Sequence, residues 1–214
     1  MERINETTKE RKRRIKSEIF QHAADLMNRD VFDTVTIRDF CRTAGITTSM
    51  FYRHFPTKES LLLYYFDQAK ERFLEQSPGH YSLDINKDNL GDKILDFYVW
   101  YAEYTKNYGV AFCTNFFNPK NRSLNANKGY NAILTTTDDF IIRAMTQDYS
   151  LPDSETPERL SRALCAIYKG IVFDWCSSGG TYDIVECVKR YMGEHINVIL
   201  HVNMGKPFLK GERR

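Results

Sequence analysis

The sequence contains no long apolar run. No stretch among its 214 residues approaches 18 consecutive apolar side chains, which excludes a membrane-spanning helix. The N-terminal segment MERINETTKERKRR is charged, and no apolar segment follows it, so we expect no secretory signal. The five cysteines are odd in number and include no CxxC pair, which predicts reduced, mostly buried thiols. These absences predict a soluble, cytoplasmic protein that does not associate with membranes.

Motifs of enzymes are also missing. The five histidines form no HExxH motif and no pair at i, i+4, and the sequence contains no P-loop, GxGxxG or GxSxG. Cys165 and Cys176 share a helix face, but no histidine lies near them to complete a zinc site or a nucleophile pair. We therefore expect no enzyme, with no catalytic residues, no metal site and no cofactor.

The net charge of +2 hides an uneven distribution of charge along the chain. The first 58 residues carry twelve Lys and Arg against eight Asp and Glu, a net charge of +4, so the remainder carries −2. A basic N-terminal arm belongs to this segment. An excess of positive charge at one end favours a nucleic-acid backbone as the partner of that end.

The apolar pattern is helical nearly throughout. Strand-like alternation is absent, and Gly and Pro fall between long stretches with a period of 3.6 residues. The pattern predicts helices over about 11–28, 37–43, 48–55, 57–73, 89–107, 111–117, 126–147, 157–177 and 182–202. We predict an all-α fold, in which a three-helix helix-turn-helix DNA-binding domain (1–66) is joined by the fourth helix to a larger helical ligand-binding and dimerisation domain (67–214).

The segment TIRDFCRTAGITTSMFYRHFPTKESLL, from Thr36 to Leu62, carries the functional argument. Thr36 can cap a helix with Asp39 at the third position, and Gly45 can adopt the left-handed conformation that turns the chain after that helix. Phe51 and Phe55 are expected in the core of this domain. Two short helices joined through a glycine are typical of a helix-turn-helix that reads DNA.

With those aromatic residues buried, the second helix of the motif presents polar side chains near its N-terminal end. An arginine can bind guanine through two hydrogen bonds, a threonine hydroxyl can contact a base, and a tyrosine can bind a phosphate. Lys58, at the start of the fourth helix, adds a positive charge where helix amides also attract a phosphate. The outward residues are Thr47, Thr48, Ser49, Tyr52 and Arg53.

The stretch AGITTSMFYRHFPTKESLL resembles the DNA-binding domain of the TetR family of bacterial repressors. The resemblance implies phosphate contacts by Tyr52, His54 and Lys58. It also implies base contacts by Thr48, Ser49 and Arg53 on the recognition helix, which is the predicted helix 48–55, and a further DNA contact by Arg38. The complete predicted DNA-binding set is Thr36, Arg38, Thr47, Thr48, Ser49, Tyr52, Arg53, His54 and Lys58.

Two positions depart from the family pattern, and two other interpretations stay open. Val31 stands where the family usually has a glycine after the first helix, which affects the local turn. Ser49 replaces a second common glycine, which bears on base preference. The helix-turn-helix can also be a purely structural corner, and His54 can be a packing histidine.

Aromatic residues are dense in the C-terminal part. Their ordinary role is core packing. The resemblance implies that the helices of this part enclose an effector pocket, so a small, largely apolar or aromatic ligand is expected. The predicted ligand-binding residues are Phe97, Trp100, Tyr101, Tyr104, Phe112, Phe116, Phe140 and Tyr168.

The last two predicted helices carry wide apolar stripes. One stripe contains Leu160, Leu164, Ile167, Ile171 and Trp175, and the other contains Val185, Val188, Met192, Ile196, Ile199 and Leu200. The resemblance implies a four-helix bundle between two subunits, and the alternative is burial within one chain. Two recognition helices about 34–36 Å apart in a homodimer can read a palindromic DNA operator.

The predicted function is that of a TetR-like homodimeric repressor that a small-molecule effector releases from its operator. The alternative is a helical adaptor that uses its C-terminal part to bind a protein partner.

Overall fold

The computed structural model describes residues 7–29, 34–76, 84–116 and 131–202. Within these ranges the chain forms helices joined by turns and no strand, which confirms the all-α fold. No helix in the described ranges is long and apolar enough to cross a bilayer.

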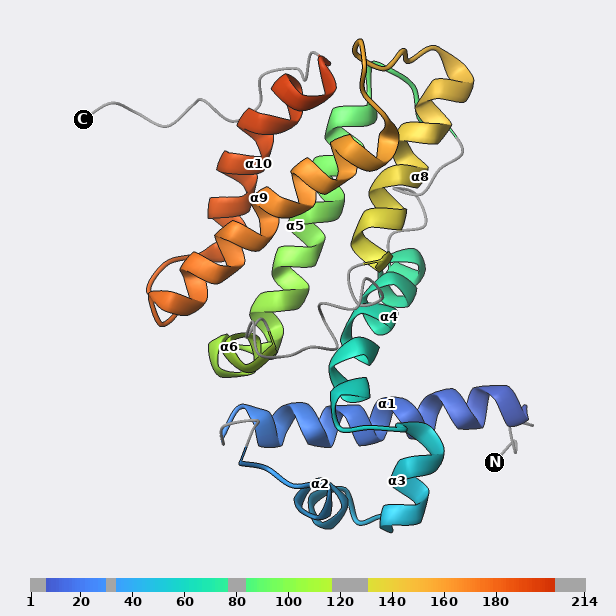
Figure 1. Ribbon diagram of the computed structural model, residues 1–214, viewed down its shortest axis with the longest axis vertical. Helices are drawn as coiled ribbons and strands as arrows, with labels where there is room; N and C mark the ends of the chain where they lie inside the picture. Colours follow the sequence, from blue (N-terminus) through green and yellow to red (C-terminus); the bar gives the residue numbers. More distant parts are fainter. Residues whose placement is uncertain (1–6, 30–33, 77–83, 117–130, 203–214) are drawn as a thin grey trace, which may run out of the picture.

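The helices form a small head and a larger body (Figure 1). The head contains α1 (Thr8–Met27), α2 (Ile37–Ala44) and α3 (Thr48–His54), and α4 (Glu59–Gln76) runs from it towards the body. The described helices of the body are α5 (Leu90–Tyr108), α6 (Val110–Phe116), α8 (Asn131–Gln147), α9 (Pro157–Ser177) and α10 (Ile184–Leu200).

Capping boxes determine where the first two helices begin. At α2, the Asp39 amide donates to Thr36 Oγ1 at 3.2 Å and the Thr36 amide donates to Asp39 Oδ2 at 2.9 Å, as predicted. At α1, Thr7 and Glu10 form the same arrangement. Because of this second box, α1 begins at Thr8 and not near residue 11, so the predicted start of the first helix was wrong.

Gly45 makes the predicted turn between α2 and α3. Its φ is +63° and its ψ is 32°, a left-handed conformation that L side chains rarely adopt. The Ile46 amide donates to Cys41 O at 2.9 Å, which satisfies a carbonyl at the end of α2. A Cβ added at Gly45 would meet no atom within 4 Å, so the backbone conformation alone requires the glycine.

Head and body share one hydrophobic core. The side chain of Phe20, on α1, is fully buried. Its ring contacts Tyr64 of α4 at 5.4 Å, Tyr108 of α5 at 5.7 Å and Phe112 of α6 at 6.2 Å between centroids. Edge-to-face contacts of this kind add to the gain from burial. The position of the head is therefore determined by packing against three further helices.

A buried chain of hydroxyl groups crosses the body. Thr105 Oγ1, on α5, lies 2.8 Å from Tyr65 Oη of α4 and 2.7 Å from Tyr168 Oη of α9. The Tyr168 hydroxyl also contacts the carbonyl of Tyr101 at 3.2 Å. Burial raises the pKa of Tyr65 and of Tyr168 well above the ordinary value, so both hydroxyls keep their protons.

The apolar stripes of α9 and α10 serve the core of the chain itself. Leu164, Met192 and Ile196 are fully buried, because α10 packs against α5 and α9. The buried members of the stripes therefore pack within one chain, while Ile167 and Ile199 are only partly buried. The four-helix bundle between subunits stays a prediction. Different side chains of the two helices face solvent, namely Phe173 at 61%, Tyr191 at 44% and Val198 at 70% exposed.

Candidate nucleic-acid interface

One face of α3 is held in the head by aromatic packing. Phe51 and Phe55 are fully buried. The Phe51 ring stacks on Phe40 at 6.4 Å and contacts Phe55 at 5.7 Å, and Phe55 contacts Tyr64 at 5.6 Å. These contacts fix the rotation of α3 about its axis, so its opposite face must point outward.

The outward face of α3 carries the residues predicted to read bases. Thr48, Ser49 and Arg53 are exposed, and Tyr52 is 52% exposed, with its ring centroid 5.7 Å from that of Phe51. Arg38 is exposed on the neighbouring helix α2. Figure 1 shows α2 and α3 on the side of α1 that faces away from the body. The structure thus gathers these predicted residues at the free end of the molecule.

Two predicted DNA contacts have a structural task. The Thr36 hydroxyl donates to Asp39 Oδ2 at 2.6 Å, and these hydrogen bonds with Thr36 lower the pKa of Asp39. Thr47 is the N-cap of α3, and its hydroxyl accepts from the Met50 amide at 3.1 Å. Both threonines therefore hold a helix in place, and their DNA contacts stay predictions.

Positive side chains from α1 lie beside the end of α3. His54 is half-buried, its Nδ1 has no hydrogen-bond partner, and burial together with Lys12, Arg53 and Lys16 lowers its pKa. Lys16 Nζ lies 4.3 Å from the centre of the Tyr64 ring. The charge distribution of the sequence indicated a basic N-terminal segment, but helical spacing alone did not single out Lys12 and Lys16.

Other basic residues of α1 are paired with carboxylates. Arg13 forms ion pairs with Glu71 at 2.9 Å and with Glu75 at 2.5 Å, both on α4. Arg14 pairs with Glu18 at 2.7 Å. These arginines are therefore less available to a phosphate than the total charge suggests.

The helix-turn-helix matches a known family. Residues 19–65 match the model described as "Bacterial regulatory proteins, tetR family", a range that extends from α1 into α4 and includes all of α2 and α3. Residues 19–65 therefore form a DNA-binding domain of the TetR family, whose members are transcriptional regulators.

Solved structures of transcriptional regulators have the same fold as this chain. A putative TetR-family regulator from Rhodococcus sp. superposes with a TM-score of 0.63 at 15% identity, covering 87% of this chain and 98% of the other. FadR from Bacillus subtilis, solved in complex with stearoyl-CoA, gives 0.65 at 13% identity with coverages of 84% and 96%. NalD of Pseudomonas aeruginosa, the secondary repressor of the MexAB-OprM multidrug efflux pump, gives 0.59 at 19% identity with coverages of 88% and 98%.

No curated protein matches the chain significantly.

Val31, the position at which the TetR family usually has a glycine, lies outside the residues that the structure describes.

The aromatic residues predicted to bind a ligand pack against one another in the body. Trp100, which is partly buried, stacks on Tyr104 at 5.3 Å, and the buried ring of Tyr101 contacts that of Tyr168 at 5.5 Å. The remaining buried members are Phe97, Phe112 and Phe140, and the side chain of Phe116 lies outside the described part. The Tyr101 hydroxyl is buried without a hydrogen-bond partner.

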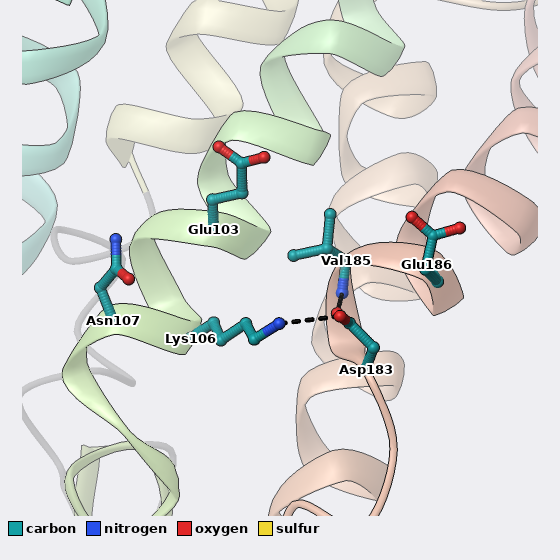
Figure 2. A pocket seen from close by; sticks show the side chains of 6 residues that line it. All are labelled: Glu103, Lys106, Asn107, Asp183, Val185 and Glu186. Atoms are coloured by element: carbon teal, nitrogen blue, oxygen red, sulfur yellow. Dashed lines mark hydrogen bonds and ion pairs between the residues drawn. The ribbon is translucent and has the colours of Figure 1, made fainter.

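A surface hollow of about 350 Å³ lies between α5 and α10 (Figure 2). Lys106 Nζ and Asp183 Oδ2 form an ion pair of 2.8 Å across it. Its other lining residues are Glu103, Asn107, Val185 and Glu186. This hollow is polar and shares no residue with the predicted ligand-binding set, so it is not the predicted effector pocket.

The cap of α3 gives a direct test of the structural task of Thr47. Thr47→Ala removes the side-chain acceptor for the Met50 amide, and we expect a loss of about 1 kcal/mol in the free energy of unfolding, measured by urea denaturation. Thr47→Ser keeps the acceptor and should retain most of that stability. Equal stability of the alanine and serine variants would contradict the capping role.

Proposed function

We propose that the chain is a homodimeric repressor that binds a palindromic operator through α3 and releases it when a small ligand binds in the body. The observation that carries the proposal is the division of α3 into a buried aromatic face and an exposed polar face. The exposed face holds the hydrogen-bonding groups that base edges and phosphates require. The residues 1–66 are proposed as the DNA-binding domain and 67–214 as the effector-binding and dimerisation domain.

The proposed contacts divide by their chemistry. Arg53 can offer two hydrogen bonds to a guanine in the major groove, and the hydroxyls of Thr48 and Ser49 can contact neighbouring bases. Phosphate contacts are assigned to Tyr52, His54 and Lys58, with Arg38 from α2. In this assignment the first group determines the sequence preference and the second group determines the position of the head on the duplex.

The DNA-binding proposal is tested by selecting bound sequences from a random DNA pool and measuring affinities by fluorescence anisotropy. We expect Arg53→Ala to weaken binding to the selected site by roughly 5- to 100-fold while binding to random DNA changes less. Lys58→Ala should weaken both kinds of binding and lower the salt dependence by about one counterion.

Arg159→Ala is the control for loss of one positive charge, because this arginine lies in the body and pairs with Glu155. It should bind like the wild type. If the wild-type protein does not distinguish the selected site from random DNA, the adaptor function becomes the better account.

The second copy in the proposed dimer covers the exposed face of α9 and α10. Ala166, Gly170 and Phe173 are exposed on one side of α9 at helical spacing, and Tyr191 and Val198 are exposed on α10. Small residues allow close approach of a facing helix, and the large side chains supply apolar area. A pair of heads is also needed because one short recognition helix contacts too little DNA to bind tightly.

Charge on this face should prevent dimer formation. Phe173→Glu places a carboxylate at a position that is already exposed in the single chain, so we expect a folded monomer by sedimentation velocity and by circular dichroism. Ile142→Glu changes an exposed apolar residue of α8 and should leave the dimer intact. A wild-type monomer, or a dimeric Phe173→Glu variant, would refute the assignment of this face.

The proposed effector is small and largely apolar or aromatic. In the described part of the chain, the polar residues that are buried are Gln68, Thr105, Thr136, Thr137 and Ser161, and none of them carries a charge. A charged ligand bound among these five residues would therefore lack a counter-charge. FadR is bound to stearoyl-CoA and NalD is a repressor, and we infer repression and small-molecule release for this chain by analogy with such regulators.

A ligand can release DNA only if it binds one conformation of the protein better than the other. The unpartnered Tyr101 hydroxyl is the group that we expect a polar atom of the ligand to meet. We expect at least one neutral aromatic compound to lower operator affinity, with Tyr101→Phe requiring roughly 2- to 10-fold more of that compound. Operator binding without ligand should be unchanged in this variant, and equal ligand affinities would exclude the Tyr101 contact.

A further inference from the structure

The head contacts the body at a second place besides α4. Asn28 is the C-cap of α1, and its side chain reaches the corner between α5 and α6. Its Nδ2 donates to the carbonyl of Tyr108 at 2.8 Å, and its Oδ1 accepts from the amide of Phe112 at 3.0 Å. One side chain of the head therefore binds backbone groups of two body helices.

These two backbone groups need partners from outside their helices. Tyr108 is the last residue of α5, whose final carbonyls have no intrahelical donor, and the Phe112 amide lies in the first turn of α6, whose amides have no intrahelical acceptor. Between them, Gly109 has a φ of +85°, and a Cβ added there would lie 3.2 Å from Asn28 Oδ1. The corner therefore offers one acceptor and one donor beside a glycine that leaves room for a side chain, and a primary amide matches both groups.

The contact is reciprocal. Asn115 of α6 donates from Nδ2 to the carbonyl of Met27, the last residue of α1, at 3.2 Å. Because these bonds run in both directions, α6 and the end of α1 cannot shift relative to each other without breaking several of them.

The helix α6 also contacts the parts of the body that a ligand would disturb. Cys113 Sγ contacts the carbonyl of Thr105, the residue at the centre of the hydroxyl chain, at 3.5 Å. At the other side of α6, a Cβ on Gly180 of the turn between α9 and α10 would lie 2.4 Å from Val110 Cγ2. Because protein interiors are closely packed, a movement of α9 or of the hydroxyl chain must therefore displace α6 or shift the other side chains that pack around it.

We infer that Asn28 is a positioning residue that transmits the position of the α5–α6 corner to the DNA-binding head by a route separate from α4. The inference rests on the proposed function for its role in regulation, while the coupling of head and body stands on the contacts alone. Without Asn28, the head remains attached through α4, the Arg13 ion pairs, the packing of Phe20 and the hydrogen bond from Asn115 to Met27, but fewer bonds hold the end of α1 to the corner.

The coupling is tested on the full chain by hydrogen–deuterium exchange with Asn28→Ala and Asn28→Asp. The aspartate keeps the size of the side chain and the acceptor for Phe112, but it cannot donate to Tyr108. We expect both variants to speed amide exchange in α1, α2 and α3 by roughly 3- to 10-fold, with α9 and α10 unchanged. Asn107→Ala is the matched control, because it removes an exposed asparagine of α5 and should leave the pattern as in the wild type.

A second measurement separates positioning from stability. The DNA is an operator selected for the wild-type protein, with one base pair inserted between its half-sites. The insertion should weaken binding of the wild type and of Asn107→Ala more than binding of either Asn28 variant. The heads of the Asn28 variants have more freedom to adapt to the changed spacing. Exchange that stays unchanged in the Asn28 variants, or that rises uniformly over the whole chain, would overturn the inference. If the wild type binds no specific DNA, the proposed function fails, and the exchange experiment still decides the coupling.

Discussion

The structure depends on α1 burying apolar side chains against both the head and the body. Phe20 shows this constraint most directly, since its ring contacts α4, α5 and α6 while the helix that carries it also packs against α2. A helix that is shared in this way cannot turn to suit one side without losing contacts on the other. The orientation of the DNA-binding surface relative to the body follows from that restriction.

The helix α3, which is the proposed recognition helix, shows that a DNA-binding surface needs little local stability of its own. A helix as short as α3, from Thr48 to His54, does not persist in water by itself. It is held by the Thr47 cap at its start and by the packing of Phe51 and Phe55 on its inner side. The groups that are proposed to face DNA are consequently ordered before DNA is present, which lowers the entropic cost of binding.

Local patterns in the sequence predicted the parts of the fold that local interactions determine. The Thr36–Asp39 box, the turn at Gly45 and the bounds of α9 all follow from residues that lie close together in the chain. The apolar stripes of α9 and α10 were placed on buried faces, but periodicity does not say whether the burying surface belongs to the same chain or to a partner. Which side chains of α9 and α10 stay exposed, Phe173 and Val198 among them, depends on the packing of α10 against α5 and α9.

Contacts between distant segments could not be predicted from spacing. Asn28 and its two partners are separated by 80 and 84 residues, and an asparagine at the end of a helix has many ordinary roles. For the same reason, the effect of Lys12 and Lys16 on His54 required the packing of α1 beside α3. The roles proposed for the predicted DNA-contact residues depend on side-chain chemistry that the sequence does show, whereas their surroundings depend on the fold.

The shared position of Phe20 also limits how such regulators can be recombined. A chimeric protein that joined this head to the body of another regulator would retain Phe20 and Asn28 but would lose the Tyr108 and Phe112 rings that contact Phe20. Phe20 would then lose apolar contacts, and the Asn28 amide would find partners only if the new corner held a backbone carbonyl and amide in the same positions. A transferable DNA-binding module from this protein therefore has to include the corner between α5 and α6, although that corner lies far from the helix-turn-helix in the sequence.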